Sequence, residues 1–380
     1  MNNKSTHLQW RTARHVLGSC SRTLLALTFL FSGFVKAVDP LGTVYKIEDY
    51  LELGFGQILQ WAMPLSGTFA ILLITTELLL GVTMLFNVRS RWTSWITLAF
   101  YLLMTPITLY IAIANPVTDC GCFGDALVIS NWATFGKNVI LLALAIVFVL
   151  CRKAIPQLFN GWAELCIALL ALGTTAGIMG YSYTHLPFID FRPYKVGNNI
   201  RELMENNVPP VVKTYCLFEK DGEQKEFIYH ERPDLNGDST WTFISQETRT
   251  LSEGKEPTIT DFYLENGDGD DVTYDILMDP EPITLIVMYD LNKRNRKQTE
   301  RAVKLYKERI ENGEQCYFLT GSSTDDIETF AQDNEIDTDA FLFNDATPIK
   351  TIVRANPGVV VLHEGTVISK HNMRQVQLKD

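Results

Sequence analysis

The chain has too few basic residues to favour a nucleic-acid partner. Its 380 residues include 33 Lys and Arg against 44 Asp and Glu, a net charge of −11. A nucleic-acid-binding protein needs a basic face, so we expect no such partner. Histidine is scarce as well, and none lies between His15 and His185. A metal site in that part of the chain would lack one of its usual ligands.

A cleavage site is also missing near the N-terminus. No small-residue motif follows the first apolar run, which Lys36, Asp39 and Pro40 close instead. A secretory signal peptide requires such a motif. We therefore expect the first run to remain as a membrane anchor.

Charge is distributed unevenly along the chain. From Met1 to His185 there are 11 Lys and Arg against 8 Asp and Glu, which leaves 22 against 36 of the total for the remainder. This pattern predicts a membrane half followed by an acidic soluble half. We place a four-helix membrane domain at 1–155, a fifth membrane helix at 156–185, a β-rich connecting segment at 186–254 and a second soluble domain at 255–380.

Five apolar runs have the length of about 20 residues that a membrane-spanning helix needs. They are Cys20 to Val38, Leu65 to Phe86, Trp92 to Ala114, Trp132 to Leu150 and Trp162 to Tyr183. Basic residues favour the cytoplasmic side, and they lie before the first run and in the second and fourth loops. This predicts a cytoplasmic N-terminus, with the first and third loops and the soluble half outside. In a bacterium that outside is the oxidising periplasm.

The third loop contains two cysteines separated by one residue. Asp119, Cys120, Gly121, Cys122, Phe123, Gly124 and Asp125 follow one another there. Glycine relaxes the backbone, so the two sulfurs can approach within a tight turn. Asp119 and Asp125 favour the turn, and as like charges they are expected to raise the pKa of the thiols. Cys120 and Cys122 are the candidate reactive residues.

Glu77 is a carboxylate near the middle of the second span. An ionisable group at this depth must be paired, protonated or exposed to a cavity. Lys36 is the candidate partner, but in straight helices Glu77 lies about 18 Å below the outer end of its span. Direct pairing would thus need tilted or offset helices. Glu77 has a structural interpretation as a helix contact and a functional one as a proton or ligand site.

The segments Ser32 to Pro40, Glu77 to Gly81 and Asp119 to Asp125 together resemble the DoxX and MauE group of small bacterial membrane proteins. The resemblance implies a four-helix bundle and a part in periplasmic disulfide handling. MauE-like proteins look like distant counterparts of DsbB and vitamin K epoxide reductase, which implies a thiol-disulfide role for Cys120 and Cys122. Those reductases carry CxxC beside a quinone site, whereas this chain has Cys-Gly-Cys, so quinone is a candidate cofactor only.

Three chemical interpretations of the cysteine pair stay open. A small-ring disulfide is strained, which favours transfer of the bond to a partner. A permanent structural bridge is the second interpretation. The third is a soft metal site, which would need two further ligands from elsewhere.

The soluble half alternates strands and helices. Val211 to Cys216 and Phe227 to His230 predict a hairpin, Thr240 to Ser245 another strand, and Gln246 to Gly254 a polar loop. Further strands are expected as a pair around Asn266 to Asp271 and at Ile283 to Tyr289, Cys316 to Leu319, Gly358 to His363 and Thr366 to Ser369. Helices are expected at Arg296 to Asn312 and Thr324 to Asp333. The order predicts a mixed α/β sheet.

The segment Pro257 to Phe262 and the pair Asn356-Pro357 before a strand resemble the thioredoxin fold in its TlpA or peroxiredoxin-like form. The resemblance implies a cis peptide bond at Pro357. It also implies a reactive cysteine after the strand that ends near Tyr289, but the chain continues there with Asp290, Leu291 and Asn292. Cys316 lies within a predicted buried strand. We therefore expect a thioredoxin-like domain without a redox centre of its own.

The sequence thus predicts an α-helical membrane bundle of four helices plus a fifth, followed by an α/β thioredoxin-like domain. We expect an inner-membrane protein that exchanges disulfides with periplasmic thiols or disulfides through Cys120 and Cys122, with the bilayer lipid as its other partner. The soluble domain would recognise the protein partner beside Pro357. The alternatives are a non-enzymatic assembly or scaffold protein with a structural disulfide and, third, a transporter that uses Glu77.

Overall fold

The structure is a computed structural model that describes residues 2–54, 56–117, 119–231, 233, 240–293 and 295–378. Five of its helices are long and apolar enough to cross a membrane. They are α1 (Asn2–Val38), α3 (Ser66–Leu85), α4 (Ser90–Ala114), α5 (Asn131–Cys151) and α6 (Gly161–Thr184). The five predicted spans are confirmed, and the protein is a multi-pass membrane protein.

Helices α1 and α3 cross closely because glycine faces the partner helix on each side. A Cβ atom built on Gly33 would lie 2.8 Å from Leu78 Cγ and 2.9 Å from the Leu78 backbone nitrogen. One on Gly81 would lie 2.9 Å from the Leu30 backbone nitrogen. Small residues let membrane helices approach to this distance. The crossing fixes the register of the two helices, which decides which polar groups meet.

Replacing Gly33 with alanine should therefore lower the free energy of unfolding by about 1–3 kcal/mol, because the methyl group overpacks the crossing. Unfolding in detergent micelles, followed by circular dichroism, measures the loss. Gly173→Ala in α6 is the matched control, since nothing lies within 4 Å of a Cβ atom built there. Equal effects of the two substitutions would contradict the close crossing.

The loop between the first two spans contains a helix that the sequence analysis did not predict. This helix, α2 (Pro40–Asp49), begins with proline, and the Asp39 side chain accepts a hydrogen bond from the Gly42 backbone N–H at 2.9 Å. Both features favour a helix start. A π-helical turn (Tyr50–Gly54) and a 3₁₀ helix (Gly56–Leu65) lead on to α3. Helix α2 carries Lys46, which pairs with Asp119 in the cysteine loop.

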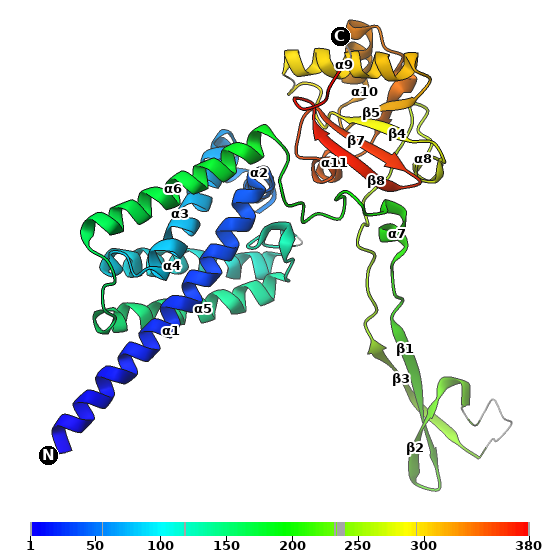
Figure 1. The fold of residues 1–380 in the computed structure, drawn as a ribbon. Coiled ribbons are helices and arrows are strands. Elements are labelled where there is room, and N and C mark those ends of the chain that lie inside the picture. Colours follow the sequence, from blue (N-terminus) through cyan, green and yellow to red (C-terminus); the bar gives the residue numbers. More distant parts are fainter. Residues whose placement is uncertain are drawn as a thin grey trace.

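A short helix and a separate three-stranded sheet follow the membrane half. They are α7 (Ile200–Glu205), β1 (Val211–Lys220), β2 (Glu223–Ile228) and β3 (Thr242–Ser252), with the strands in the order β2-β1-β3. The predicted hairpin is confirmed and turns at Asp221 and Gly222, which both have positive φ. The polar loop predicted from Gln246 is wrong, because its backbone pairs antiparallel with β1 as far as Ser252. The sheet projects away from both larger parts (Figure 1).

The C-terminal domain has a five-stranded mixed sheet in the order β6-β5-β4-β7-β8. Parallel pairing joins β4 (Ile283–Val287), β5 (Gln315–Thr320) and β6 (Phe341–Phe343), whereas β7 (Gly358–His363) and β8 (Thr366–Asn372) are antiparallel. Its helices are α8 (Thr273–Met278), α9 (Arg296–Glu311), α10 (Thr324–Asn334) and α11 (Ala346–Ile352). The Asn356-Pro357 bond is cis, as predicted. This is a thioredoxin-like domain.

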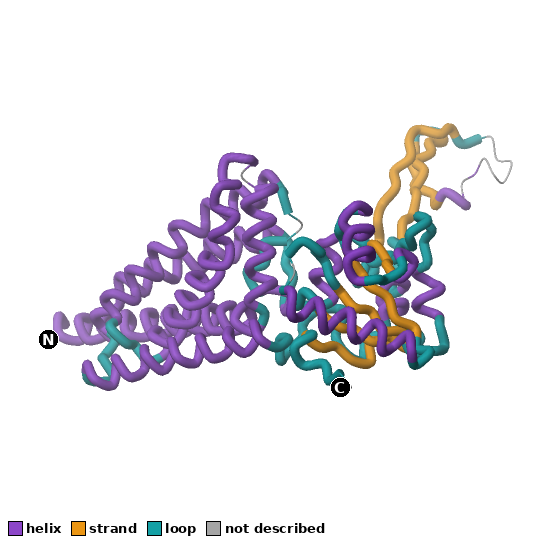
Figure 2. Tube along the Cα trace, turned by 90° about the horizontal axis from the view of Figure 1, so that it is seen from above, coloured by secondary structure: helices purple, strands orange, loops and turns teal. Residues whose placement is uncertain are grey.

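Two apolar cores cover the faces of that sheet. One contains Leu285 and Ile352, and the other contains Phe318 and Cys316, which is 3% exposed. Burial of Cys316 agrees with its interpretation as a core residue. The strand pair predicted around Asn266 to Asp271 is wrong, because this stretch is a turn closed by a single bridge between Glu265 and Asp271. Figure 2 shows the helical membrane part on one side and the mixed sheet on the other.

Candidate functional site

The cysteine loop connects α4 and α5 and holds its two thiols in contact. Cys120 and Cys122 are free cysteines whose Sγ atoms lie 2.9 Å apart. Gly121 and Gly124 adopt positive φ angles of 62° and 52°, and the Gly124 N–H donates to the Gly121 carbonyl at 3.0 Å. Glycine adopts this backbone conformation without strain. The predicted tight turn therefore brings the sulfurs together.

One side of the cysteine loop is fixed by the segment between α1 and α3. The Asp119 carboxylate accepts a hydrogen bond from the Gly121 N–H at 2.8 Å and from Lys46 Nζ at 3.0 Å. The Tyr50 hydroxyl donates to the Cys120 carbonyl at 2.6 Å. Burial raises the pKa of Tyr50, so the hydroxyl keeps the proton that it donates. Asp119 thus shapes the turn, as expected, and its charge is paired with that of Lys46.

Beneath the loop, Lys36 and Glu77 form a buried ion pair. Lys36 Nζ lies 2.7 Å from Glu77 Oε1, and both side chains are 6% exposed. Lys36 is therefore the partner of Glu77 that the sequence suggested, although straight helices with aligned ends would have kept the two residues apart. The crossing at Gly33 and Gly81 sets the register instead and brings the two charges to one level.

Ser32 connects this ion pair to the cysteine loop. Its Oγ lies 2.8 Å from Lys36 Nζ, 2.8 Å from Glu77 Oε2 and 2.6 Å from the Cys122 carbonyl oxygen. A hydroxyl has one proton to donate, so Ser32 accepts from Lys36 and donates either to Glu77 or to Cys122. The buried ion pair and the backbone of the cysteine loop are thereby joined through the Ser32 hydroxyl.

The two thiols differ in acidity. A hydrogen bond from Cys120, with further help from the cations Lys137 and Lys36, lowers the pKa of Cys122 to about 6 against the opposing effects of burial and Glu77. The same shared proton, together with burial, raises the pKa of Cys120. Cys122 is therefore the more acidic of the two thiols, and the thiolate that an acidic thiol forms is the nucleophilic form of cysteine.

The expectation that Asp119 and Asp125 raise the pKa of both thiols is wrong for Cys122. Lys46 pairs with Asp119, and Arg354 pairs with Asp125 at 3.0 Å, so neither carboxylate is a bare charge beside the sulfur. The pKa of Cys120 is raised, as expected, but the causes are the hydrogen bond shared with Cys122 and burial.

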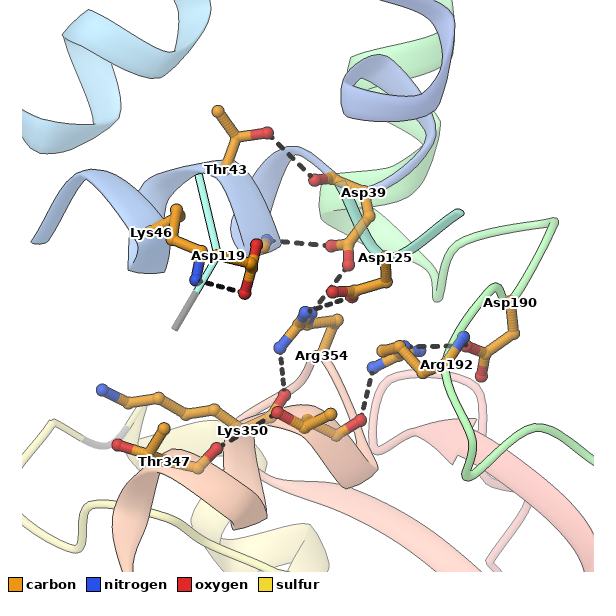
Figure 3. Close-up of polar contacts among 12 residues, drawn as sticks. Asp39, Thr43, Lys46, Asp119, Asp125, Asp190, Arg192, Thr347, Lys350 and Arg354 are labelled. Carbon is orange, nitrogen blue, oxygen red and sulfur yellow. Dashed lines mark hydrogen bonds and ion pairs between the residues drawn. The ribbon is translucent and has the colours of Figure 1, made fainter. Parts of the chain in front are cut away.

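Arg354 comes from the thioredoxin-like domain. It follows α11 and precedes the cis bond between Asn356 and Pro357. The Pro357 side chain is buried. The Nε of Arg354 lies 2.8 Å from Asp39 Oδ2, and the terminal nitrogens of Arg354 reach Asp125 and the Lys350 carbonyl (Figure 3). Nearby, the Tyr45 hydroxyl contacts the Tyr289 hydroxyl at 3.2 Å. The end of the sheet at which β7 begins, next to Pro357, therefore faces the cysteine loop of the same chain.

A cavity of about 390 Å³ lies below the loop, inside the membrane part. Both cysteines line it, together with Lys36 and Glu77, and most of the remaining wall is apolar or aromatic, for instance Phe29 and Phe100. Ligand sites have this combination of apolar walls and a few polar groups. Among the described residues, no group of three or more His, Cys, Asp or Glu is placed to hold a metal ion.

Four residues of the site were missed in the sequence analysis: Lys46, Tyr50, Lys137 and Arg354. Lys137 lies in α5, with Nζ 4.2 Å from the centroid of the Phe123 ring. A lysine inside an apolar run is a signal that could have been read from the sequence. The other three reach the loop through α2, the π-helical turn and the soluble domain, whose positions no local pattern specifies.

The fold and the site describe a multi-pass membrane protein with a dithiol loop and a thioredoxin-like domain. Residues 14–151 match the family model described as Methylamine utilisation protein MauE. The membrane region is thus a MauE-family region, and the match ends before α6 begins.

Among solved structures, one of BsSco, a member of the Sco family of cytochrome c oxidase assembly proteins, is similar to the soluble part. The sequence identity is 12%, the match covers 31% of this chain and 84% of that chain, and the TM-score is 0.25. None of the curated proteins matches the chain.

Proposed function

We propose that the protein is a bacterial inner-membrane thiol-disulfide exchange protein that acts through Cys120 and Cys122. The supporting observation is the pair of free thiols 2.9 Å apart, in which sharing a proton lowers the pKa of Cys122 to about 6. A low-pKa, partly exposed thiol with a second thiol in contact is the arrangement that exchange requires.

In the reduced protein, the Cys122 thiolate attacks one sulfur of a partner disulfide. The S–S bond of the partner breaks, its second sulfur leaves as a thiolate, and a mixed disulfide forms. The Cys120 thiol then loses its proton and displaces the partner from Cys122, which closes the Cys120–Cys122 disulfide. Two electrons have moved to the partner, which takes up two protons as a dithiol. The reverse sequence oxidises a partner dithiol and restores the loop.

We propose that the loop faces the periplasm and exchanges with periplasmic protein thiols or disulfides. The position of basic residues in the second and fourth loops supports this orientation. The thioredoxin-like domain would guide the protein partner, since it touches the loop through Arg354 and Asp125. The apolar cavity would admit a lipid-soluble electron carrier such as a quinone from the membrane side.

The redox state of Cys120 and Cys122 in cells tests the proposal. Acid quenching, thiol alkylation and peptide mass spectrometry should find a mixture of thiol and disulfide that shifts when periplasmic oxidation is disturbed. In a Cys120→Ser variant, no thiol is left to displace the partner from Cys122. The mixed disulfide between Cys122 and the partner should therefore be trapped. Cys316, which is buried, is the internal control and should stay reduced. A pair that stays oxidised under every condition would make the loop a structural bridge.

A further inference from the structure

Arg354 connects three segments that are far apart in the sequence. Its side chain is 6% exposed, and its guanidinium contacts Asp39 after α1, Asp125 in the cysteine loop and the Lys350 carbonyl in α11. An arginine presents its donors in a rigid fork, so two carboxylates bound at once are held in a defined geometry. Figure 3 shows the guanidinium next to the carboxylates of both Asp39 and Asp125.

Asp125 transmits this contact to the thiols because it is close to Cys122 in the chain. Only Phe123 and Gly124 separate them, and a Cβ atom on Gly124 would lie 3.0 Å from Val35 Cγ1, so the connection has little room to move. At the other end of the loop, Lys46 of the membrane domain holds Asp119. The loop is therefore clamped at both ends, and one of the two clamps belongs to the soluble domain.

We propose that Arg354 is a positioning residue through which the thioredoxin-like domain, without a cysteine of its own at the usual place, holds Cys120 and Cys122 in contact. The domain thus contributes to the geometry of the dithiol through a residue that lies just before Pro357. The inference rests on the proposed thiol chemistry of the same loop, but it concerns the geometry of the sulfurs and has a separate readout.

The pH profile of Cys122 alkylation supplies that readout. The full chain in lipid nanodiscs is reduced, exposed to iodoacetamide between pH 4.5 and 9.5, and analysed by peptide mass spectrometry. Arg354→Gln should raise the midpoint by about one pH unit, so the rate at pH 6 falls about fivefold. Other charged groups that face Cys122, namely Lys36, Glu77 and Lys137, are unchanged in this variant.

Two further variants decide between positioning and general damage. Asp125→Asn breaks the same ion pair from the loop side and should give a similar shift, with no further shift when it is combined with Arg354→Gln. Arg296→Gln is the matched control, because the Arg296 side chain is 94% exposed. If Arg354→Gln does not fold, the alkylation midpoint of Cys122 in Asp125→Asn alone tests the inference.

The inference is overturned if Arg354→Gln and Asp125→Asn keep the wild-type midpoint, or if Arg296→Gln shifts it equally. Its failure is separable from failure of the proposed function. A shifted midpoint in a loop that never changes redox state in cells would retain the positioning role and remove the exchange function. A loop that cycles in cells with an unshifted midpoint would remove the positioning role alone.

Discussion

Replacing Cys120 with alanine should slow the alkylation of Cys122 at pH 7 by about 30-fold. The hydrogen bond from Cys120 is the largest cause of the low pKa of Cys122, which is about 6. Without that donor the pKa should rise towards the ordinary value of about 8.5, and the thiolate fraction at pH 7 falls from roughly nine-tenths to about one-thirtieth. Iodoacetamide labelling of the full chain, followed over time by peptide mass spectrometry, measures the rate.

Cys120→Ser provides an internal comparison because a hydroxyl can still donate to the Cys122 sulfur. It should slow labelling less than alanine does. Cys316→Ala removes a buried thiol of the soluble domain and should leave the rate at Cys122 unchanged. Equal rates in the wild type and in Cys120→Ala would show that the two thiols do not share a proton.

The membrane part could be predicted well because each spanning helix satisfies its own backbone hydrogen bonds. Length and apolarity alone therefore locate α1, α3, α4, α5 and α6. The cysteine loop was found for a similar reason, since a single glycine between two cysteines is a local feature. Its sulfurs meet through the positive φ of Gly121, which the sequence itself indicates.

Contacts between distant segments could not be predicted in the same way. Arg354 is 229 residues from Asp125, and its position depends on how an entire α/β domain sits on the membrane part. The pairing of Lys36 with Glu77 was underestimated because the depth of each residue was taken from the ends of its own span. The close approach at Gly33 sets the relative height of the two helices instead.

Strand β3 illustrates a different limit. Most of its residues are polar and all are exposed, so the alternation that marks a half-buried strand is absent. The segment is a strand because β1 offers its backbone for pairing over nearly its full length. Pairing of this kind is determined by the partner strand and by the turns that align it, rather than by the composition of the segment.

Replacing Lys36 with methionine should lower the free energy of unfolding of the membrane domain by about 3–5 kcal/mol. The carboxylate of Glu77 would remain buried, with Ser32 as its remaining donor among the described residues. Removing one partner of a buried ion pair leaves an uncompensated charge, and this costs more than the pair contributes as a whole. Reversible unfolding in mixed detergent micelles measures the difference.

The double variant Lys36→Met/Glu77→Leu separates this cause from loss of packing. Because it removes both charges, it should recover most of the stability that Lys36→Met loses. Lys153→Met makes the same substitution at an exposed position just after α5 and should change the free energy of unfolding by less than about 0.5 kcal/mol. If the double variant is as unstable as Lys36→Met, the loss comes from packing at the α1–α3 crossing.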